Sequence, residues 1–376
     1  MTRFVRSFAS AAAPSTWDVR IVDDPREVAE QWRFLEESGH ATAFQTRAWL
    51  QPWLDIVAPA HGAEPVFVLV SGYSDGAPKM LLPLCRRTWR TLRAIEFADL
   101  GASDYNAPLL ANDFRPTPAQ FAGLWAQIRA RLPAADIVRI DKSPATVGEA
   151  PNPLADLPFM RRLSLGAWRL SLPGAREAYE REMLSAHARK TIKSKRRRLG
   201  TYGDLRLRWA GDRDEAVGML RELVEMRSRR FTALGRHDIL ADPAFCAFYE
   251  SLFSHPQNAA EICALDVGGA RVALLFGLRC GETFLYLMSG FAADEWAARS
   301  VGSVATDLAI ARAIAAGLRT FDFTIGNERF KRDFGARRYD LYGGAQTLTS
   351  RALPQVARSW LKGFLRERLR ASKRPL

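Results

Sequence analysis

The 376-residue sequence lacks the features that mark membrane-spanning and secreted proteins. It has no uninterrupted run of 18 apolar residues, which argues against a transmembrane helix. Its first residues include no continuous apolar core, so we expect a flexible tail over residues 1–16 instead of a signal peptide. These two absences together predict a cytoplasmic protein.

Several motifs for metals and nucleotides are also missing. The four cysteines lie far apart without a CxxC pair, and the five histidines form no HxH or HExxH pattern, so we predict no metal site. The sequence contains no G-x-x-x-x-G-K-[ST], G-x-G-x-x-G or G-x-S-x-G. We therefore do not expect nucleotide hydrolysis, Rossmann-type dinucleotide binding or serine-hydrolase chemistry.

The positive charge is concentrated in two short segments. The net charge is +13, and residues 186–200 contain seven basic residues and no acidic one. Residues 351–376 contain eight basic residues and one acidic residue, while the rest of the chain is nearly neutral. Such segments attract phosphate, nucleic acid or an anionic membrane surface.

The hydrophobic pattern predicts strands, then a helix, then a strand, in each half of the chain. We expect strands at residues 17–22, 66–70, 79–85, 94–100, 137–140, 168–171, 205–209, 261–267, 271–279, 283–289 and 320–324. We expect helices at residues 25–38, 45–57, 118–132, 213–234, 243–253 and 302–316, and one from residue 175 into the basic run. This order indicates two similar α/β domains.

Four prolines in residues 143–158 suggest a crossing between the two domains. We accordingly place an N-terminal domain at residues 17–150, a linker at 151–166 and a C-terminal domain at 167–350. Residues 351–376 are predicted to form a basic amphipathic helix. That helix either docks on its own domain or lies on anionic lipid at the inner membrane surface.

The region most informative about chemistry begins after the strand that ends near Ser289. A loop there leads into a helix whose first turn reads Arg299-Ser300-Val301-Gly302-Ser303. Backbone N–H groups are unpaired at a helix N-terminus, and a glycine lets a phosphate approach them. A plain helix start that is capped by a serine is the alternative.

This arrangement resembles the GNAT superfamily of acyl-CoA-dependent N-acyltransferases. Arg299 and Gly302 match its Arg/Gln-x-x-Gly-x-Gly/Ala loop, whereas Val304 replaces the small last residue. Residues 321–335, FDFTIGNERFKRDFG, are similar to a stretch of the acetyltransferases named for cellulose biosynthesis (CelD/BcsL type). These are relatives of the FemABX peptidyltransferases with tandem GNAT-like domains. The similarity extends to residues 44–53, 101–110 and 184–200.

The resemblance implies an α/β (α+β) fold of two tandem GNAT-like domains, each a mixed, largely antiparallel sheet flanked by helices. It also implies that acetyl-CoA or another acyl-CoA binds the C-terminal domain at Arg299, Ser300, Val301, Gly302 and Ser303. The expected reaction transfers an acyl group, most simply acetyl, to an amine. The acceptor implied by the resemblance is an amino sugar or a surface-polysaccharide precursor.

Two other functions remain open. One is a transfer-RNA-dependent aminoacyltransferase of the FemABX type, and the other is a non-catalytic GNAT-like protein in polysaccharide assembly. The basic run at residues 186–200 has three candidate ligands: the phosphates of coenzyme A, an anionic acceptor, or RNA. The sequence contains no aromatic RNA-binding motif, so RNA is the least favoured of these three ligands.

N-acylation requires a base for the attacking amine and donors for the developing oxyanion. The candidate catalytic residues are Glu328 as base or amine ligand, Tyr286 as proton donor to the leaving thiolate, and Lys331 as partner of a phosphate or substrate. An ordinary surface ion pair between Glu328 and Lys331, spaced i, i+3, is the alternative.

Three further residues are candidates for binding the acceptor. By resemblance, Asp104 and Tyr105 reach the cleft between the domains from the loop GASDYN at residues 101–106. Asp322, between two phenylalanines, is the third. The structural alternatives are a turn-capping role for Asp104 and backbone hydrogen bonding for Asp322.

Overall fold

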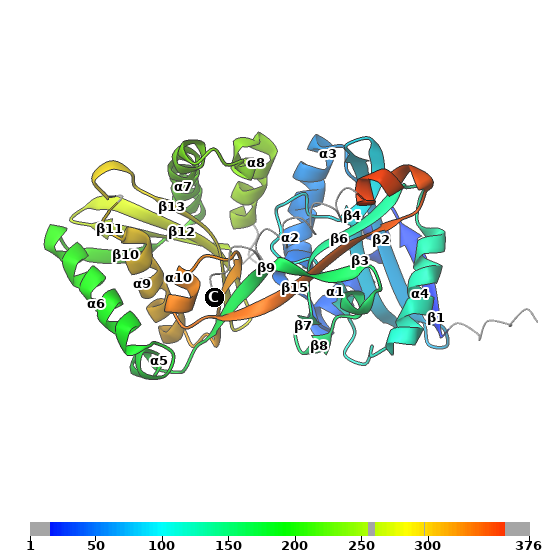
Figure 1. Cartoon of the computed structure of the whole chain (residues 1–376), viewed down its shortest axis with the longest axis horizontal. Coiled ribbons are helices and arrows are strands. Elements are labelled where there is room, and N and C mark those ends of the chain that lie inside the picture. The colour runs from blue at the N-terminus through cyan, green and yellow to red at the C-terminus, as the bar shows by residue number, and fades with distance from the viewer. Residues whose placement is uncertain (1–15, 255–259, 297, 358–376) are drawn as a thin grey trace, which may run out of the picture.

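A computed structural model describes residues 16–254, 260–296 and 298–357, which form two lobes that share one long sheet (Figure 1). The predicted tail therefore lies outside the described residues except for Thr16, and so does most of the predicted C-terminal helix. Within the described part of the chain, no helix has the length and apolar composition needed to cross a membrane.

The N-terminal lobe contains the first strands of the sheet and a set of short helices. Its strands are β1 (Trp17–Val22), β2 (Glu64–Gly72), β3 (Pro78–Trp89), β4 (Leu92–Phe97), β5 (Leu109–Leu110) and β6 (Ile137–Pro144). Its helices are η1 (Pro25–Val28), α1 (Ala29–Ser38), η2 (Ala43–Gln45), α2 (Arg47–Pro52), η3 (Trp53–Val57), α3 (Ala58–Ala60) and α4 (Pro118–Arg131). A small hairpin of β7 (Thr146–Val147) and β8 (Ala150–Pro151) and the turn η4 (Pro153–Asp156) follow.

The C-terminal lobe repeats this order with longer helices. Its strands are β9 (Met160–Ser171), β10 (Leu205–Trp209), β11 (Ala260–Val267), β12 (Ala270–Cys280), β13 (Thr283–Phe291), β14 (Thr320–Ile325) and β15 (Arg337–Thr347). Its helices are α5 (Arg176–Glu182), α6 (Ala186–Leu199), η5 (Gly200–Tyr202), α7 (Arg213–Ala233), η6 (Ile239–Ala241), α8 (Pro243–Ser251), η7 (Leu252–Ser254), η8 (Asp294–Trp296), α9 (Val301–Ala315), α10 (Phe330–Asp333) and η9 (Ser350–Ala352).

Local sequence signals explain where several helices begin. Thr117 and Gln120 form a capping box at the start of α4. The side chains of Ser185, Asp212 and Asp242 cap α6, α7 and α8 by accepting backbone N–H bonds. These caps account for the agreement at the helix starts predicted at residues 118, 213 and 243. The single helix predicted from residue 175 into the basic run is wrong, because the chain leaves α5 after Glu182 and Ser185 caps the new helix α6.

The sheet has an internal repeat that matches the predicted fold class. The strand order is β1-β2-β3-β4-β6 in the first lobe and β10-β11-β12-β13-β14 in the second. In each lobe the pairs are antiparallel except the last, β4 with β6 and β13 with β14. The expected α/β fold with a mixed, largely antiparallel sheet flanked by helices is therefore confirmed.

The two lobes exchange their central strands. β9 follows the N-terminal lobe in the chain but pairs with β14, whereas β15 follows the C-terminal lobe and pairs with β6. β9 and β15 also pair with each other, so the sheet runs without a break through both lobes (Figure 1). The predicted linker, residues 151–166, is therefore wrong as a loop, because its second part is strand β9 inside the sheet. The strand β15 was not predicted.

The helices cover both faces of the C-terminal part of the sheet. α7 and α8 lie on one face, and α5, α6 and α9 lie on the other (Figure 1). One apolar core is continuous across the lobes, because Trp49 of α2 packs edge-on against Phe248 of α8 at 4.9 Å between ring centroids. At the end of the described chain, Ala352 and Val356 pack against β4 and β6.

Candidate active site

The candidate site lies where β13 and β14 separate. These parallel strands pair only between Thr283–Leu285 and Thr320–Asp322. β13 then continues to Phe291, and a bulge opposite Phe276 and Gly277 of β12 leaves Leu287 as an extra residue in the ladder. Because a bulged residue is left out of the ladder, the N–H of Leu287 is a candidate donor to a carbonyl in the gap.

A cavity of about 930 Å³ opens at this separation. Residues from β13, β14, α7, the start of α9 and the N-terminal lobe line this cavity. The predicted site residues that line it are Asp104, Tyr286, Ser300, Val301, Gly302, Ser303, Glu328 and Lys331. Arg299, Tyr105 and Asp322 are not among its lining residues. Eight of the eleven predicted residues thus meet in one place.

The start of α9 forms one wall of the cavity. Ser300 has a left-handed backbone (φ 60°) and makes no side-chain capping bond. A Cβ atom at Gly302 would lie 2.7 Å from the ring of Phe291, so glycine is required there for the ring to pack against the helix. Because no side chain caps the first turn of α9, the unpaired backbone N–H groups of that turn can bind an anion.

Arg299 does not have the predicted position. Its guanidinium stacks on the rings of Tyr202 and Trp296, at 3.9 and 4.6 Å from their centroids, and pairs with Glu295 at 3.4 Å. The side chain therefore stabilises the loop before α9 and does not line the cavity. A direct contact between Arg299 and a bound phosphate is not supported by this arrangement.

Tyr286 projects from β13 into the cavity. Burial is the main cause that raises the pKa of its hydroxyl to about 12, and the neighbouring side chains of Ser289 and Thr306 act in the opposite direction. The phenol therefore keeps its proton at neutral pH. It is available as a hydrogen-bond donor to a negatively charged leaving group.

Glu328 and Lys331 form the ion pair that the i, i+3 spacing allows, with 3.0 Å between Nζ and Oε2. The lysine side chain is only 5% exposed, and its ammonium donates hydrogen bonds to the carbonyl oxygens of Phe323 and Ile325 at the end of β14. These contacts occupy the lysine, so the predicted role of neutralising a phosphate is not supported. The Glu328 side chain is 56% exposed at the cavity rim.

Asp104 reaches the same cavity from the opposite lobe. Its side chain faces Thr324 of β14, whose hydroxyl donates to the carbonyl oxygen of Tyr286 at 3.1 Å. Burial is the largest influence on this carboxyl and raises its pKa to about 6, while Thr324, Lys142 and Lys331 act in the opposite direction. A carboxyl with this pKa is ionised at neutral pH and accepts a proton readily.

The loop that carries Asp104 is held by a dense set of hydrogen bonds. The carboxylate of Asp99 accepts bonds from the backbone N–H groups of Gly101 and Ser103 and pairs with Lys142 at 2.6 Å. Tyr249 of α8 donates to the carbonyl of Ala102 at 3.2 Å. The position of Asp104 is therefore determined by groups from both lobes.

Tyr105 and Asp322 form a buried bridge between the lobes and do not line the cavity. The hydroxyl of Tyr105 donates to Asp322 Oδ1 at 2.8 Å, and the Nε of Arg169 donates to Oδ2 at 2.8 Å. The backbone N–H of Thr324 also donates to Oδ1. The predicted role in acceptor binding is therefore wrong for both residues, because neither side chain is accessible to an acceptor.

Four arginines that line the cavity were not predicted from the sequence. Arg227, Arg229 and Arg230 belong to α7, and Arg236 follows that helix. Arg227 pairs with Asp238 and Arg229 with Glu225, whereas Arg230 and Arg236 form no ion pair within the described residues. The concentration of arginines at residues 227–236 was the available signal, but helical periodicity gave no indication that they share a cavity with Asp104.

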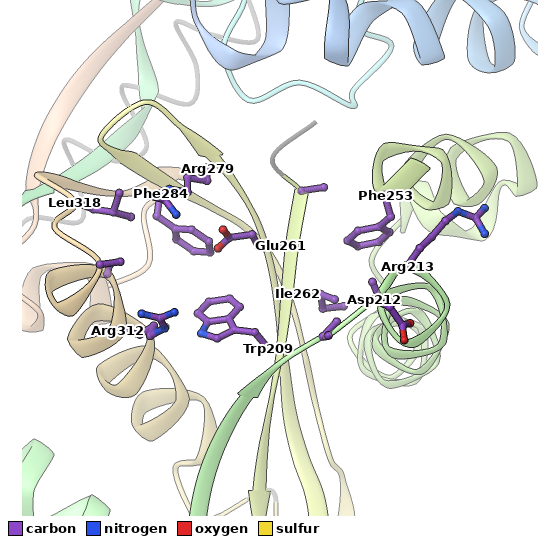
Figure 2. A pocket seen from close by; sticks show the side chains of 17 residues that line it. Trp209, Asp212, Arg213, Phe253, Glu261, Ile262, Arg279, Phe284, Arg312 and Leu318 are labelled. Atoms are coloured by element: carbon purple, nitrogen blue, oxygen red, sulfur yellow. The ribbon is translucent and has the colours of Figure 1, made fainter. Parts of the chain in front are cut away.

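A second pocket, of about 380 Å³, lies at the other edge of the C-terminal lobe (Figure 2). Figure 2 shows its side chains around β11, with Trp209 and Arg312 toward α9 and Phe253 and Arg213 toward α7. None of the predicted site residues lines this pocket. The chemistry suggested by the sequence therefore belongs to the larger cavity.

Comparisons with known proteins support a GNAT-type fold. A family model described as an acetyltransferase (GNAT) domain matches residues 186–332, the part of the chain that contains the start of α9 and the arginines of α7. No curated protein matches the sequence.

Solved structures resemble both lobes together. FemX is 13% identical with a TM-score of 0.60, and the match covers 89% of this chain and 99% of FemX. The C-terminal domain of a putative lysylphosphatidylglycerol synthetase from Agrobacterium fabrum is 12% identical with a TM-score of 0.54, covering 88% and 95%. A tandem GNAT protein from the clavulanic acid biosynthesis pathway is 14% identical with a TM-score of 0.50, covering 88% and 98%. The fold of this chain is thus similar to that of tandem GNAT proteins.

Gly302 offers a direct test of the wall formed by α9. In Gly302→Val, the added side chain must displace Phe291 from the first turn of α9, so we expect acetyl-CoA binding to weaken at least tenfold, a rough figure for a disturbed binding wall. Isothermal titration calorimetry measures the dissociation constant. Gly218→Val is the matched control, because Gly218 lies in helix α7 with no atom within 4 Å of the added Cβ. Equal binding by both variants and the wild type would contradict a donor site at Gly302.

Proposed function

We propose that this protein transfers an acyl group, most simply acetyl, from a coenzyme A thioester to an amine, with Asp104 as the general base. The observation that carries the proposal is that Asp104 and the start of α9 line one cavity, although they lie in different lobes. The GNAT domain match over residues 186–332 supports a thioester donor at α9.

The side chains have distinct tasks in this reaction. Asp104 removes the proton from the attacking amine nitrogen as the new C–N bond forms. The N–H of Leu287 stabilises the negative charge on the thioester oxygen. The C–S bond then breaks, and Tyr286 donates a hydrogen bond to the leaving sulfur, which ends as the thiol with the proton released by the amine.

Asp104 is a better candidate for the base than Glu328 for two reasons. Burial raises its pKa toward neutrality, and its surroundings hold it on the inner side of the cavity. The carboxylate of Glu328 is more exposed and pairs with Lys331. Glu328, exposed at the rim, contacts the acceptor while it remains paired with Lys331.

The acceptor that we propose is an amino sugar, or a precursor of a surface polysaccharide of the kind that CelD/BcsL-type enzymes would use. The unpaired Arg230 and Arg236 on the cavity wall favour an acceptor that also has a negative group. The first experiment incubates the purified protein with acetyl-CoA and a panel of amines that includes neutral and phosphorylated amino sugars, and measures thiol release and product mass. Thiol release without any acylated amine, or transfer only from aminoacyl-transfer RNA, would contradict the proposal.

The pH dependence of acyl transfer provides a further prediction. Because the base must be ionised, kcat/KM should fall about tenfold per pH unit below the pKa of Asp104, near 6, and level off above it apart from the ionisation of the acceptor. Initial rates measured with two amines that differ in pKa distinguish the ionisation of Asp104 from the ionisation of the acceptor. The transition near pH 6 should stay in place when the amine is changed, and a profile that follows only the pKa of the amine would contradict the role of Asp104.

A further inference from the structure

Lys142 has an unusual backbone conformation within strand β6. Its φ angle is 55°, a left-handed value that residues other than glycine rarely adopt. A residue stays in such a conformation only where its surroundings determine it strongly, and such positions cluster at functional sites. The contacts of Lys142 are made with the loop that carries Asp104.

Lys142 bonds this loop on both sides of Asp104. Its Nζ donates a hydrogen bond to the carbonyl oxygen of Ser103, the residue before Asp104. Its own carbonyl oxygen accepts a bond from the backbone N–H of Asn106 at 3.1 Å. Asp104 therefore lies between two residues that are bonded to Lys142, and strand β6 fixes the path of the loop.

The ammonium of Lys142 is buried and paired. Its side chain is 13% exposed, and Nζ lies 2.6 Å from Asp99 Oδ2. Burial acts to lower the pKa of this ammonium, but the carboxylates of Asp99, Asp104 and Asp141 raise it overall, so the group is charged at neutral pH. A fixed positive charge in a buried site favours the ionised form of a neighbouring carboxyl.

The other charged groups around Asp104 act in both directions. The ammonium of Lys331 favours the ionised carboxyl, whereas the carboxylate of Asp99 opposes it. The phenols of Tyr105 and Tyr249 stay protonated, because burial raises the pKa of each above its ordinary value. The ionisation of Asp104 thus depends on a balance of nearby charges. The remaining charged groups that line the same cavity are Arg227, Arg229, Arg230, Arg236 and Glu328.

We infer that Lys142 is a positioning residue for Asp104: it fixes the loop on either side of this residue, and its buried charge keeps the carboxyl ionised. The inference rests on the proposed function, in which Asp104 is the base, and adds the group that prepares this base. Among the charges that act on Asp104, that of Lys142 has the largest effect. A carboxyl that burial drives toward its protonated form needs such a partner to act as a base at neutral pH.

The test breaks the ion pair between Lys142 and Asp99 from each side. Lys142→Met removes the positive charge, so the transition in kcat/KM near pH 6 should move up by about one pH unit. Asp99→Asn removes the negative charge, so the transition should move down, by a smaller amount. Both variants lose the same contact, and a purely structural defect would not move the transition in opposite directions. The pH profiles of acyl transfer, recorded with the same two amines as for the wild type, measure these shifts.

Two controls accompany the single variants. Lys79→Met makes the same chemical change at an ion pair with Asp113, 2.8 Å long, and Lys79 does not line the cavity, so its transition should stay near pH 6. If Lys142→Met does not fold because Asp99 is left buried without its partner, the double variant Lys142→Met/Asp99→Asn is compared with Asp99→Asn. These two proteins differ only at Lys142, and the transition should lie at the higher pH in the double variant.

Three outcomes would overturn the inference while leaving Asp104 as the base. They are an unmoved transition in Lys142→Met, shifts of both single variants in the same direction, and equal transitions in the double variant and Asp99→Asn. A wild-type profile without a transition near pH 6 would instead overturn the proposed role of Asp104.

Discussion

Replacing Asp104 with asparagine is expected to lower kcat/KM for acyl transfer by about a thousandfold, within the range for removal of a general base. Asparagine has nearly the same shape as aspartate, but it cannot take a proton from the amine. Donor binding, which depends on the start of α9 in the other lobe, should remain within about twofold of the wild type, well under 1 kcal/mol. Steady-state kinetics and calorimetry measure the two quantities separately.

Stability provides the control for this variant. The pKa of Asp104 is raised from 3.8 to about 6 in the folded protein, so the folded state holds this proton more tightly than the unfolded state does. The contribution to stability is complete below pH 3.8 and is lost as the pH rises through 6. At pH 7 the asparagine variant should therefore be no less stable than the wild type.

Glu328→Gln distinguishes the two carboxylates. If Asp104 is the base, Glu328→Gln should retain most of the wild-type kcat and the transition near pH 6. An Asp104→Asn variant with near-normal turnover, combined with an inactive Glu328→Gln variant, would reassign the base to Glu328.

Replacing Asp322 with alanine is expected to reduce the free energy of unfolding by about 3 kcal/mol, the lower end of the range for breaking a buried ion pair from one side. The Asp322 side chain is 2% exposed and accepts hydrogen bonds from Tyr105, Arg169 and the N–H of Thr324. Its removal leaves all three donors without this acceptor where the lobes meet. Urea unfolding measures the loss.

Asp340→Ala is the matched control for this prediction. Asp340 lies on β15 and pairs with Arg162 at 3.1 Å and with Arg338 at 3.6 Å, but its side chain is 33% exposed against 2% for Asp322. An exposed pair contributes less than about 1 kcal/mol, so this variant should unfold close to the wild type. A loss of similar size in both variants would show that Asp322 has no special role in joining the lobes.

The local elements of this fold could be predicted because they depend on short-range signals. The caps of α6 and α7, the turns at Gly268-Gly269 and Gly281, and the buried runs of β11–β13 are all visible in the sequence. β15 was not predicted, since its residues alternate poorly and include Gly343-Gly344. This strand forms because β6 and β9 supply partners on both sides.

The candidate site was predictable in part. The motif around Gly302 and the segment that contains Glu328 and Lys331 are local in sequence, and they do meet at the cavity. The buried state of Tyr105 and Asp322 was not predictable, because their hydrogen bond joins residues 217 positions apart. Whether a polar side chain faces a cavity or a buried partner depends on what packs against it.

The sequence by itself determined most of the strands and helices other than β15, the concentration of charge in α6 and the helix start near Gly302. These features follow from periodicity, capping and composition over a few consecutive residues. Only the tertiary structure decided that Asp104 enters the cavity of the other lobe, that Lys331 is occupied by strand carbonyls and that Lys195 turns toward Ser303. The exchange of β9 and β15 joins the lobes and so brings Asp104 to that cavity, whereas the contacts of Lys331 and Lys195 form where α10 packs against β14 and α6 against α9 within the C-terminal lobe.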